Sequence, residues 1–429
     1  MICLPVSAGR FFCREENRML KLLLLSLVLT AMPALWSAPD TAAAQRAPET
    51  LVYPGDSMWL TKQKMQSDPE YLKLERKQLV IVANKILDEK IATVMDKPAV
   101  AHSGDKHDYY SWANYYWPDP TKPDGKPYIS KDGQENPERL KYTDEIPFLT
   151  MIRNVRTLAF AGYYTDDARY FAKAAEYLRA WFITPETRMN PNMKYSQVML
   201  GKNEDRGYGA GIITLSFRIQ YLLDSVTLLQ GQPCWSEADH AAFDRWLREY
   251  MNWLATSPLS EDAKRFTNNH STYFAAQQAM LHLHFGEKEA ARQVIADIFD
   301  KRFAIQFAED GSQPREMGRA ISFTYSTMNL RGWVSLAEMG KRCGFDGYAY
   351  KSSKGTGIYE ALKFFQPFVN GGKEWKGKQI KGGIPYASVW ELMVMGARQF
   401  DDPEFDQAAM AIADKPRLRL EKFYFPYVK

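Results

Sequence analysis

The chain has 429 residues, with 55 Lys and Arg against 51 Asp and Glu, which gives a formal net charge of +4 at pH 7. This near balance excludes the strongly basic composition of typical nucleic-acid-binding proteins, so an anionic ligand would need a local basic groove. Aromatic residues make up 14% of the chain, with 11 Trp and 24 Tyr; this content favours a carbohydrate ligand, although a large aromatic core gives the same count.

The first 45 residues have the pattern of a secretory leader. Lys21 precedes an apolar run over about 22–35, and small residues follow it, which is the order of a cleaved signal peptide. A membrane anchor is the alternative, but the run is short and Pro33 interrupts it. We therefore expect 1–45 to be leader and signal peptide and 46–429 to form one domain. We expect the mature protein to be exported, to the periplasm, without a further membrane span.

Cysteine usage gives little sign of a metal site. Two of the four cysteines lie in the leader, and Cys234 and Cys343 remain. They could form one disulfide in an exported protein, and the sequence leaves this pairing open. The cysteines lack CxxC spacing and an HExxH motif is absent, so we expect neither a metal nor another cofactor.

Helical spacing of apolar residues dominates the chain after the leader. Apolar residues recur at spacings of three and four over 212–229, and Ser236 with Asp239 forms a capping signature before the next such segment. An alternating strand pattern is absent, and only 305–307 suggests a short extended piece. Helical patterns also cover 68–94, 145–160, 166–182, 286–303, 325–340, 356–368 and 386–399. Many helix pairs without a sequence repeat predict an all-α fold, an (α/α) toroid or incomplete α/α barrel.

Residues 107–137 interrupt the helices with a long loop rich in Tyr, Trp, Pro and Gly. Loops of this length in compact domains are usually functional or disordered, and the aromatic density argues against disorder. An equally good alternative is that the aromatic side chains pack the loop onto the rim of the toroid. The candidates for stacking on sugar rings are Trp112, Tyr115, Tyr116 and Trp117.

The stretch "TNNHSTYF", residues 267–274, precedes an apolar helical run. We expect Asn268 to cap that helix, because Asn is a preferred N-cap residue. Asn269 and His270 would then face a substrate. The alternative is that His270 simply points into the core.

A second stretch, "EDGSQPREMGRAISFTYSTMNL", covers residues 309–330. Glu316 and Arg319 lie three residues apart, so one can orient the other on a helical face. Tyr325 follows Arg319 by six residues, and an ordinary ion pair with a core tyrosine would give the same pattern. Gln313 and Arg206 are weaker candidates for contact with a ligand carboxylate.

A set of Asn, His, Arg and Tyr suits β-elimination on a uronic acid. The C5 proton of a uronate is poorly acidic because the neighbouring carboxylate is negative, and hydrogen-bond donors to that carboxylate stabilise the enolate-like intermediate. A tyrosinate can remove the proton, and a tyrosine hydroxyl can protonate the leaving glycosidic oxygen. We expect the nearby arginine to lower the pKa of the tyrosine. No metal is required.

The motifs "NNHS", "DGSQPxExxR" and "YSTMNL" resemble the alginate lyase superfamily, and the aromatic loop and "GKNEDRGYGAGI" are similar to other segments of its members. The six-residue spacing resembles polysaccharide lyase family 38, which acts on alginate or glucuronan, more than family 5. The resemblance implies that Asn269 and Arg319 neutralise the substrate carboxylate. Tyr325 would be the acid, and also the base for elimination on one face. His270 would assist neutralisation or be the base for the opposite stereochemistry.

The resemblance implies a lyase that cleaves a uronate polysaccharide and leaves 4,5-unsaturated ends. Its expected partner is an anionic polysaccharide or oligosaccharide. A toroid glycoside hydrolase is one alternative, but it needs two carboxylates that flank the bond, and the spacing of Asp108, Glu204, Asp205 and Glu316 supports no such pair. A non-catalytic glycan-binding protein is the other. The preferred uronate, endo or exo action and oligomeric state stay open.

Overall fold

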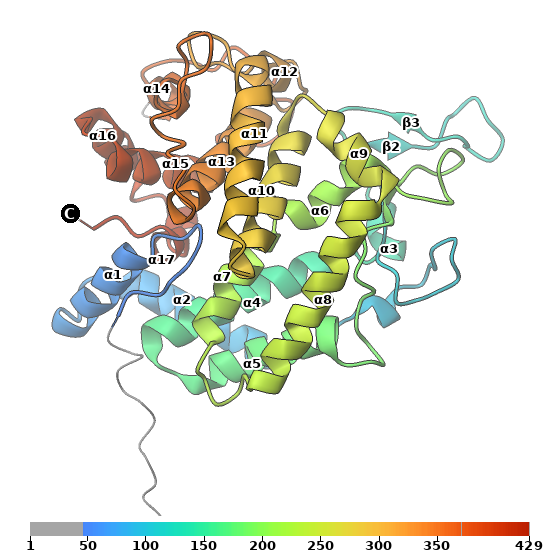
Figure 1. Ribbon diagram of the computed structural model, residues 1–429, viewed down its shortest axis with the longest axis horizontal. Coiled ribbons are helices and arrows are strands. Elements are labelled where there is room, and N and C mark those ends of the chain that lie inside the picture. Colours follow the sequence, from blue (N-terminus) through green and yellow to red (C-terminus); the bar gives the residue numbers. More distant parts are fainter. Residues whose placement is uncertain (1–45, 370, 429) are drawn as a thin grey trace, which may run out of the picture. The chain divides into compact units, whose positions relative to one another are not determined.

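Helices make up most of the computed structural model, which describes residues 46–369 and 371–428 (Figure 1). The longer helices are α1 (Gly55–Ser67), α2 (Lys73–Leu87), α4 (Glu145–Thr165), α5 (Ala168–Leu178), α7 (Ile219–Leu229), α8 (Glu237–Thr256), α9 (Pro258–Arg265), α10 (Asn269–His284), α11 (Lys288–Gln306), α13 (Ser322–Arg342), α14 (Ile358–Val369), α15 (Tyr386–Gln399) and α16 (Pro403–Ile412). The short ones are α3 (Arg139–Tyr142), α6 (Ile213–Ser216), α12 (Pro314–Met317) and α17 (Glu421–Tyr424).

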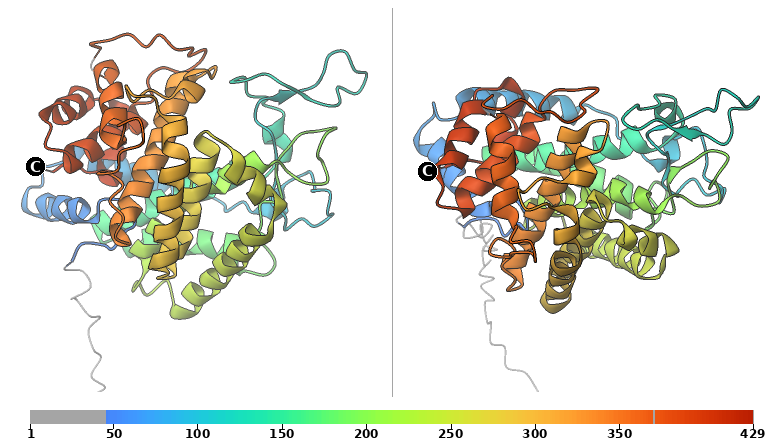
Figure 2. Two further views of the ribbon diagram at one scale, coloured as in Figure 1. Left: turned by 45° about the horizontal axis from the view of Figure 1, so that its top comes forward. Right: turned by 90° about the horizontal axis from the view of Figure 1, so that it is seen from above.

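Consecutive helices pack against each other in pairs. α4 packs against α5, α10 against α11, and α15 against α16. The pairs are joined because α10 also packs against α13, and α13 against α15; these helices lie side by side in all views (Figures 1 and 2). Short connections between neighbouring helices favour such antiparallel pairing. The predicted all-α toroid is confirmed.

Local sequence signals fix several helix starts. Ser236 and Asp239 form the predicted capping box at the start of α8, with each side chain bound to the backbone of the other. Ser257 caps α9, and Pro258 occupies the first helical position, where its missing N–H costs nothing. These caps set the direction of the two helices that lead to α10.

The core explains much of the aromatic content. Trp246 stacks on Tyr250, with ring centroids 5.6 Å apart, and both side chains are buried. Trp333 meets the ring of Phe299 edge-on at 5.0 Å, also within the core. Aromatic composition by itself is therefore weak evidence for sugar binding in this protein.

The predicted element boundaries hold for most helices and fail in two places. α15 spans the predicted 386–399, and α13 contains the predicted 325–340. The predicted helix over 68–94 is shorter, because α2 begins at Lys73 and ends at Leu87. The suggested extended piece at 305–307 is wrong for its first two residues: α11 continues to Gln306, and Phe307, which follows the helix, has extended backbone.

Four short strands lie in the described chain, where the sequence shows no alternating strand pattern. β1 (Tyr110–Trp112) pairs in parallel with β4 (Tyr195–Val198), and β2 (Tyr116–Trp117) pairs antiparallel with β3 (Ile129–Ser130). Strands of two to four residues are too short to show an alternating pattern. The aromatic loop is therefore an ordered structure, with one antiparallel ribbon of its own and one strand paired to β4 outside the loop.

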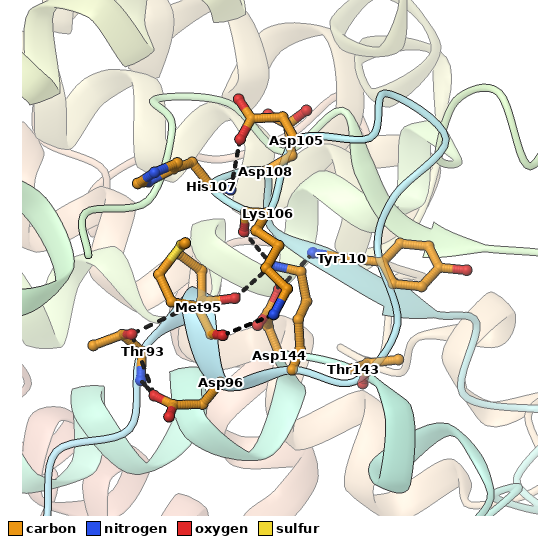
Figure 3. A network of polar contacts seen from close by, with 12 residues as sticks. Thr93, Met95, Asp96, Asp105, Lys106, His107, Asp108, Tyr110, Thr143 and Asp144 are labelled. Atoms are coloured by element: carbon orange, nitrogen blue, oxygen red, sulfur yellow. Dashed lines mark hydrogen bonds and ion pairs between the residues drawn. The ribbon is translucent and has the colours of Figure 1, made fainter. Parts of the chain in front are cut away.

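A buried ion pair anchors the ends of this loop, within a network of polar contacts that includes Asp144 and Tyr110 (Figure 3). Lys97 Nζ lies 3.0 Å from Asp144 Oδ2, and neither side chain has exposed surface. Lys97 also donates to the carbonyl of Val94, and Asp144 accepts from the backbone N–H of Tyr110 at 2.9 Å. Burial raises the pKa of Asp144 to about 7, against the opposing effect of Lys97. The pair joins the segments before and after the loop.

Residues Gly209–Leu229 are long and apolar enough to cross a membrane by length and composition, contrary to the expectation that no segment after the leader has this character. However, 78% of the apolar window is buried inside the protein. This segment contains α6 and α7, which are core helices here.

Cys234 and Cys343 are free thiols, so the disulfide that the sequence left open is not formed in this structure. The predicted leader, 1–45, lies outside the described residues. Its cleavage, export of the protein and the division into leader and single domain stay predictions.

Candidate active site

The start of α10 carries two of the predicted catalytic residues. Asn268 is the N-cap, as predicted, and its side chain accepts a hydrogen bond from the backbone N–H of His270. Asn269 is fully buried at the first helical position, whereas His270 is half-buried. The N-terminus of a helix carries partial positive charge, so this position favours an anionic group.

A sharp turn places the second predicted stretch opposite α10. Gly311 has a φ of +83°, and a Cβ at this position would lie 2.2 Å from the carbonyl oxygen of Glu360. Only glycine fits there, because the turn needs both the left-handed conformation and the close approach. Pro314 then starts the short helix α12, as its fixed φ favours.

Glu316, on α12, binds Asn269 rather than the predicted Arg319. Its Oε1 accepts hydrogen bonds from the backbone N–H of Asn269 at 2.7 Å and from Nδ2 at 2.8 Å. Glu316 is buried, which raises the pKa of its carboxyl, while the two hydrogen bonds from Asn269 oppose that rise. An amide nitrogen has two hydrogens, so Asn269 keeps one for a ligand.

Arg319 instead forms an ion pair with Asp132 of the aromatic loop. Nη2 lies 2.6 Å from Asp132 Oδ1, and Nε donates to both carboxylate oxygens at 3.2 Å. Asp132 also accepts from the backbone N–H of Ala320 at 2.9 Å. The guanidinium carbon lies 3.7 Å from the centroid of the Tyr325 ring. Arg319 therefore connects the loop to the predicted catalytic tyrosine.

Tyr325 lies in the first turn of α13, and its hydroxyl is 2.7 Å from the hydroxyl of Tyr115 in the aromatic loop. Burial raises the pKa of Tyr325 well above its usual value, and Tyr115 raises it further. Arg319 lowers this pKa, as expected from the sequence, but does not outweigh burial. The expectation of a tyrosine with a lowered pKa is therefore wrong for this state, in which the phenol is neutral.

The pKa of His270 is shifted downward, opposite to that of Tyr325. Burial, and then the positive charge of Arg319, lower its pKa to about 4. The imidazole is therefore neutral at neutral pH and can accept a proton.

One cavity of about 550 Å³ brings the four predicted catalytic residues together. Its size lies within the range of ligand pockets, roughly 300–1,000 Å³. One face of α13 forms a wall, and Tyr115 and Tyr116 of the aromatic loop form part of another. The lining from α10, α13 and the residues before it includes Asn269, His270, Arg319, Ile321, Thr324, Tyr325, Met328 and Arg331.

A second depression, of about 520 Å³, adjoins the first because Arg319 lines both. Arg265 and Arg315 line it too, beside the N-cap Asn268. This cluster of arginines supplies the local basic groove that an anionic ligand would need.

The two predicted tryptophans do not line the cavity. Trp112 stacks on Tyr142 at 5.6 Å, and its Nε1 donates to the hydroxyl of Tyr110 at 2.8 Å. Trp117 Nε1 donates to the carbonyl of Gln134 at 2.9 Å. Both side chains pack the loop, which was the alternative reading of the aromatic segment.

Gln313 and Arg206 do not reach the cavity either. Gln313 is buried, donates to the carbonyl of Ser326 at 2.8 Å and accepts from Asn329 at 2.7 Å. Arg206 is exposed on the segment between β4 and α6. Gln313 is therefore a hydrogen-bonded residue of the core, and Arg206 is a solvent-exposed surface residue.

Sequence reasoning missed Asp132 as the partner of Arg319. The two lie 187 residues apart, and no local pattern signals such a contact. Within the described ranges, no group of three or more His, Cys, Asp and Glu is placed to hold a metal ion. The expectation of a reaction without a cofactor stays a prediction.

Comparison of the sequence and the structure with known proteins identifies the family of this chain. The sequence profile of the alginate lyase family matches residues 93–375. No match is found among curated proteins. An alginate lyase from Bacteroides ovatus is 31% identical, with a TM-score of 0.83 over 88% of this chain and 99% of that chain.

A variant of alginate lyase A1-III, an enzyme of a Sphingomonas species, in complex with a tetrasaccharide is 16% identical. The comparison covers 87% of this chain and 98% of that one, with a TM-score of 0.51, and shows a shared fold. The resemblance seen in the motifs is confirmed at the level of the family, and the assignment to polysaccharide lyase family 38 stays a prediction. Because the family match spans more than half of the residues, the chain belongs to the alginate lyase family.

Proposed function

We propose that this protein is a polysaccharide lyase that cleaves alginate, or the related polymer glucuronan, by β-elimination. One observation carries the proposal: Asn269, His270, Arg319 and Tyr325 converge on one cavity in a member of the alginate lyase family. The product would carry a 4,5-unsaturated uronate at its new non-reducing end.

The substrate carboxylate would lie between α10 and Arg319. Asn269 offers its second amide hydrogen, and Arg319 offers Nη1, which takes no part in its contact with Asp132. The N-terminus of α10 adds partial positive charge. These donors neutralise the carboxylate, so negative charge that develops at C5 can spread onto it.

The pKa directions give the starting protonation states of the proposed base and acid. His270 is neutral, because its pKa is lowered to about 4, and it would remove the C5 proton. Tyr325 is neutral too, because burial raises its pKa, and it would donate its proton to the glycosidic oxygen as the C4–O4 bond breaks. The electrons of the C5–H bond form the C4=C5 double bond. No metal takes part in this scheme. Where the C5 proton and the leaving group share a face, Tyr325 would have to act as both base and acid.

The cavity disfavours the hydrolase alternative. A glycoside hydrolase needs one free carboxylate and one carboxylic acid beside the bond. Glu316 is bound to Asn269, and Asp132 is ion-paired with Arg319. Asp108 accepts hydrogen bonds from Ser103, Asn190 and Asn192 and does not line the cavity.

A panel of polymers tests the proposal: mannuronate-rich alginate, guluronate-rich alginate, glucuronan and a neutral glucan. Ultraviolet absorbance of the unsaturated uronate and reducing ends are measured together. A lyase raises both signals on at least one uronate polymer. Reducing ends without absorbance would identify a hydrolase, and binding without either signal would identify a glycan-binding protein.

We also propose that the protein is exported, with 1–45 removed and 46–429 forming the functional domain. The order of charge, apolar run and small residues in the leader supports this. N-terminal sequencing of the protein from the periplasmic fraction tests it. An intact leader on cytoplasmic protein would contradict it.

A further inference from the structure

The acids that line the cavity are all neutralised. Each is ion-paired within the described chain: Asp132 with Arg319, Glu135 with Arg139 and Lys381, and Glu145 with Arg139. Among the lining arginines, Arg331 lies 2.5 Å from Glu391, a buried glutamate. Arg218 is the lining arginine that has no ion pair with any described residue. Counted together with these ion-pair partners, the cavity therefore carries one positive charge in excess, and that charge lies at Arg218.

Arg218 lines the same cavity as Tyr325 and follows Phe217, which also lines it. The ring centroids of Phe217 and Tyr273 lie 4.8 Å apart. Tyr273 follows His270 by three residues on α10. The guanidinium of Arg331 lies 5.8 Å from the ring of Phe217. Arg331 follows Tyr325 by six residues on the same wall, a separation of about 9 Å along a helix axis.

Arg218 is half-buried, and its guanidinium has few partners in the described chain. Arg218 donates one hydrogen bond, from Nη1 to the carbonyl of Thr214 at 2.9 Å, and its other N–H groups donate to no residue in the part of the chain that the structure describes. Burial lowers the pKa of Arg218, and the charge of Glu145 offsets this only in part. The guanidinium nevertheless stays protonated. An anion in the cavity would provide the missing counter-charge.

We infer that Arg218 binds the carboxylate of a second uronate, next to the one held by Asn269 and Arg319. This inference rests on the proposed function, because it concerns the substrate of the same cavity. The planar guanidinium fits a carboxylate with two parallel hydrogen bonds. Two carboxylate sites in one cavity require charged sugars at both positions, so the enzyme selects uronates on both sides of the bond or at successive positions on one side.

Binding to a catalytically silenced protein tests the inference. Calorimetry would compare Tyr325→Phe with Tyr325→Phe/Arg218→Met, using an alginate tetrasaccharide and the same tetrasaccharide with its carboxyls reduced to alcohols. We expect Arg218→Met to weaken binding of the charged tetrasaccharide at least about tenfold, since hydrogen bonds between charged groups contribute roughly 1.5–3 kcal/mol. The reduced tetrasaccharide should bind the two variants equally.

The matched control is Arg292→Met, which removes an exposed arginine from α11. Arg218→Lys keeps the positive charge. In the Tyr325→Phe background its affinity for the charged tetrasaccharide should lie between the affinities of Tyr325→Phe and Tyr325→Phe/Arg218→Met. This variant keeps the test decisive where Arg218→Met fails to fold. Unchanged affinity for the charged tetrasaccharide in folded Arg218→Met, or an equal loss for the reduced one, would overturn the inference.

These measurements do not depend on turnover. If the wild type forms no unsaturated product but binding depends on Arg218, the proposed function fails and the carboxylate site stands. If product forms and Arg218→Met binds normally, the carboxylate site alone fails.

Discussion

Glu316 holds Asn269 with a single carboxylate oxygen, which accepts from the backbone N–H at 2.7 Å and from the side-chain amide at 2.8 Å. The contact joins α12 to the first turn of α10, and Glu316 is 1% exposed. It orients the Asn269 amide, so that the remaining amide hydrogen has a defined direction. Glu316 is therefore a positioning residue for the proposed carboxylate site.

Glu316→Gln should lower kcat/KM about 10- to 100-fold, mainly through kcat, because the charged hydrogen bonds contribute roughly 1.5–3 kcal/mol. Kinetics on alginate measure this, with melting temperature as a check on folding. Glu309→Gln, an exposed glutamate seven residues earlier, is the matched control. A kcat/KM equal to that of the wild type in Glu316→Gln would show that the orientation of Asn269 does not matter.

The acid limb of the pH profile should lie near pH 4. The pKa of His270 is lowered to about 4, so the imidazole is neutral above that pH and activity falls only as pH drops through it. The profile of kcat/KM reports the free enzyme and is the measurement to use. An acid limb near 6.5, the ordinary histidine value, would contradict His270 as a neutral base with a lowered pKa.

Asp132 and Arg319 should act as one unit. Asp132→Ala frees the guanidinium from its bidentate partner, and we expect a loss of about tenfold or more in kcat/KM. Arg319→Ala should cost more, and the double variant should cost no more than Arg319→Ala alone, since groups that act together are not additive. Strictly additive losses would show that Asp132 acts elsewhere, for instance by ordering the aromatic loop.

Chelation should leave activity unchanged. The proposed scheme uses only side chains, so EDTA at millimolar concentration should not alter the initial rate on alginate. Dialysis followed by addition of calcium or zinc serves as the control. A rate that falls with EDTA and returns with one metal ion would contradict a scheme without metal.

Helices were predictable where apolar residues recur at helical spacing over a long stretch of the sequence. Residues 386–399 show the helical period throughout, and α15 spans that range. The short strands of the aromatic loop were not predictable, because β2 and β3 have two residues each and depend on pairing across the loop. Tertiary contacts, rather than local preference, form them.

Within the site, local motifs identified the residues but not their partners. The cap Asn268 and the turn at Gly311 are signals within a few residues. The contact between Tyr115 and Tyr325 spans 210 residues, and only the fold reveals it. The direction of the Tyr325 pKa also escaped prediction, because burial outweighs the neighbouring arginine.

The most direct test of the proposed chemistry compares Tyr325→Phe and Tyr115→Phe on alginate. The two tyrosines share one hydrogen bond, at 2.7 Å between hydroxyls, but only Tyr325 is proposed to give its proton to the leaving group. The absorbance of unsaturated product should be lost in Tyr325→Phe, by about 10²-fold or more, and should stay within about tenfold of the wild type in Tyr115→Phe. Unsaturated product at the wild-type rate from Tyr325→Phe would contradict the proposed role of this tyrosine.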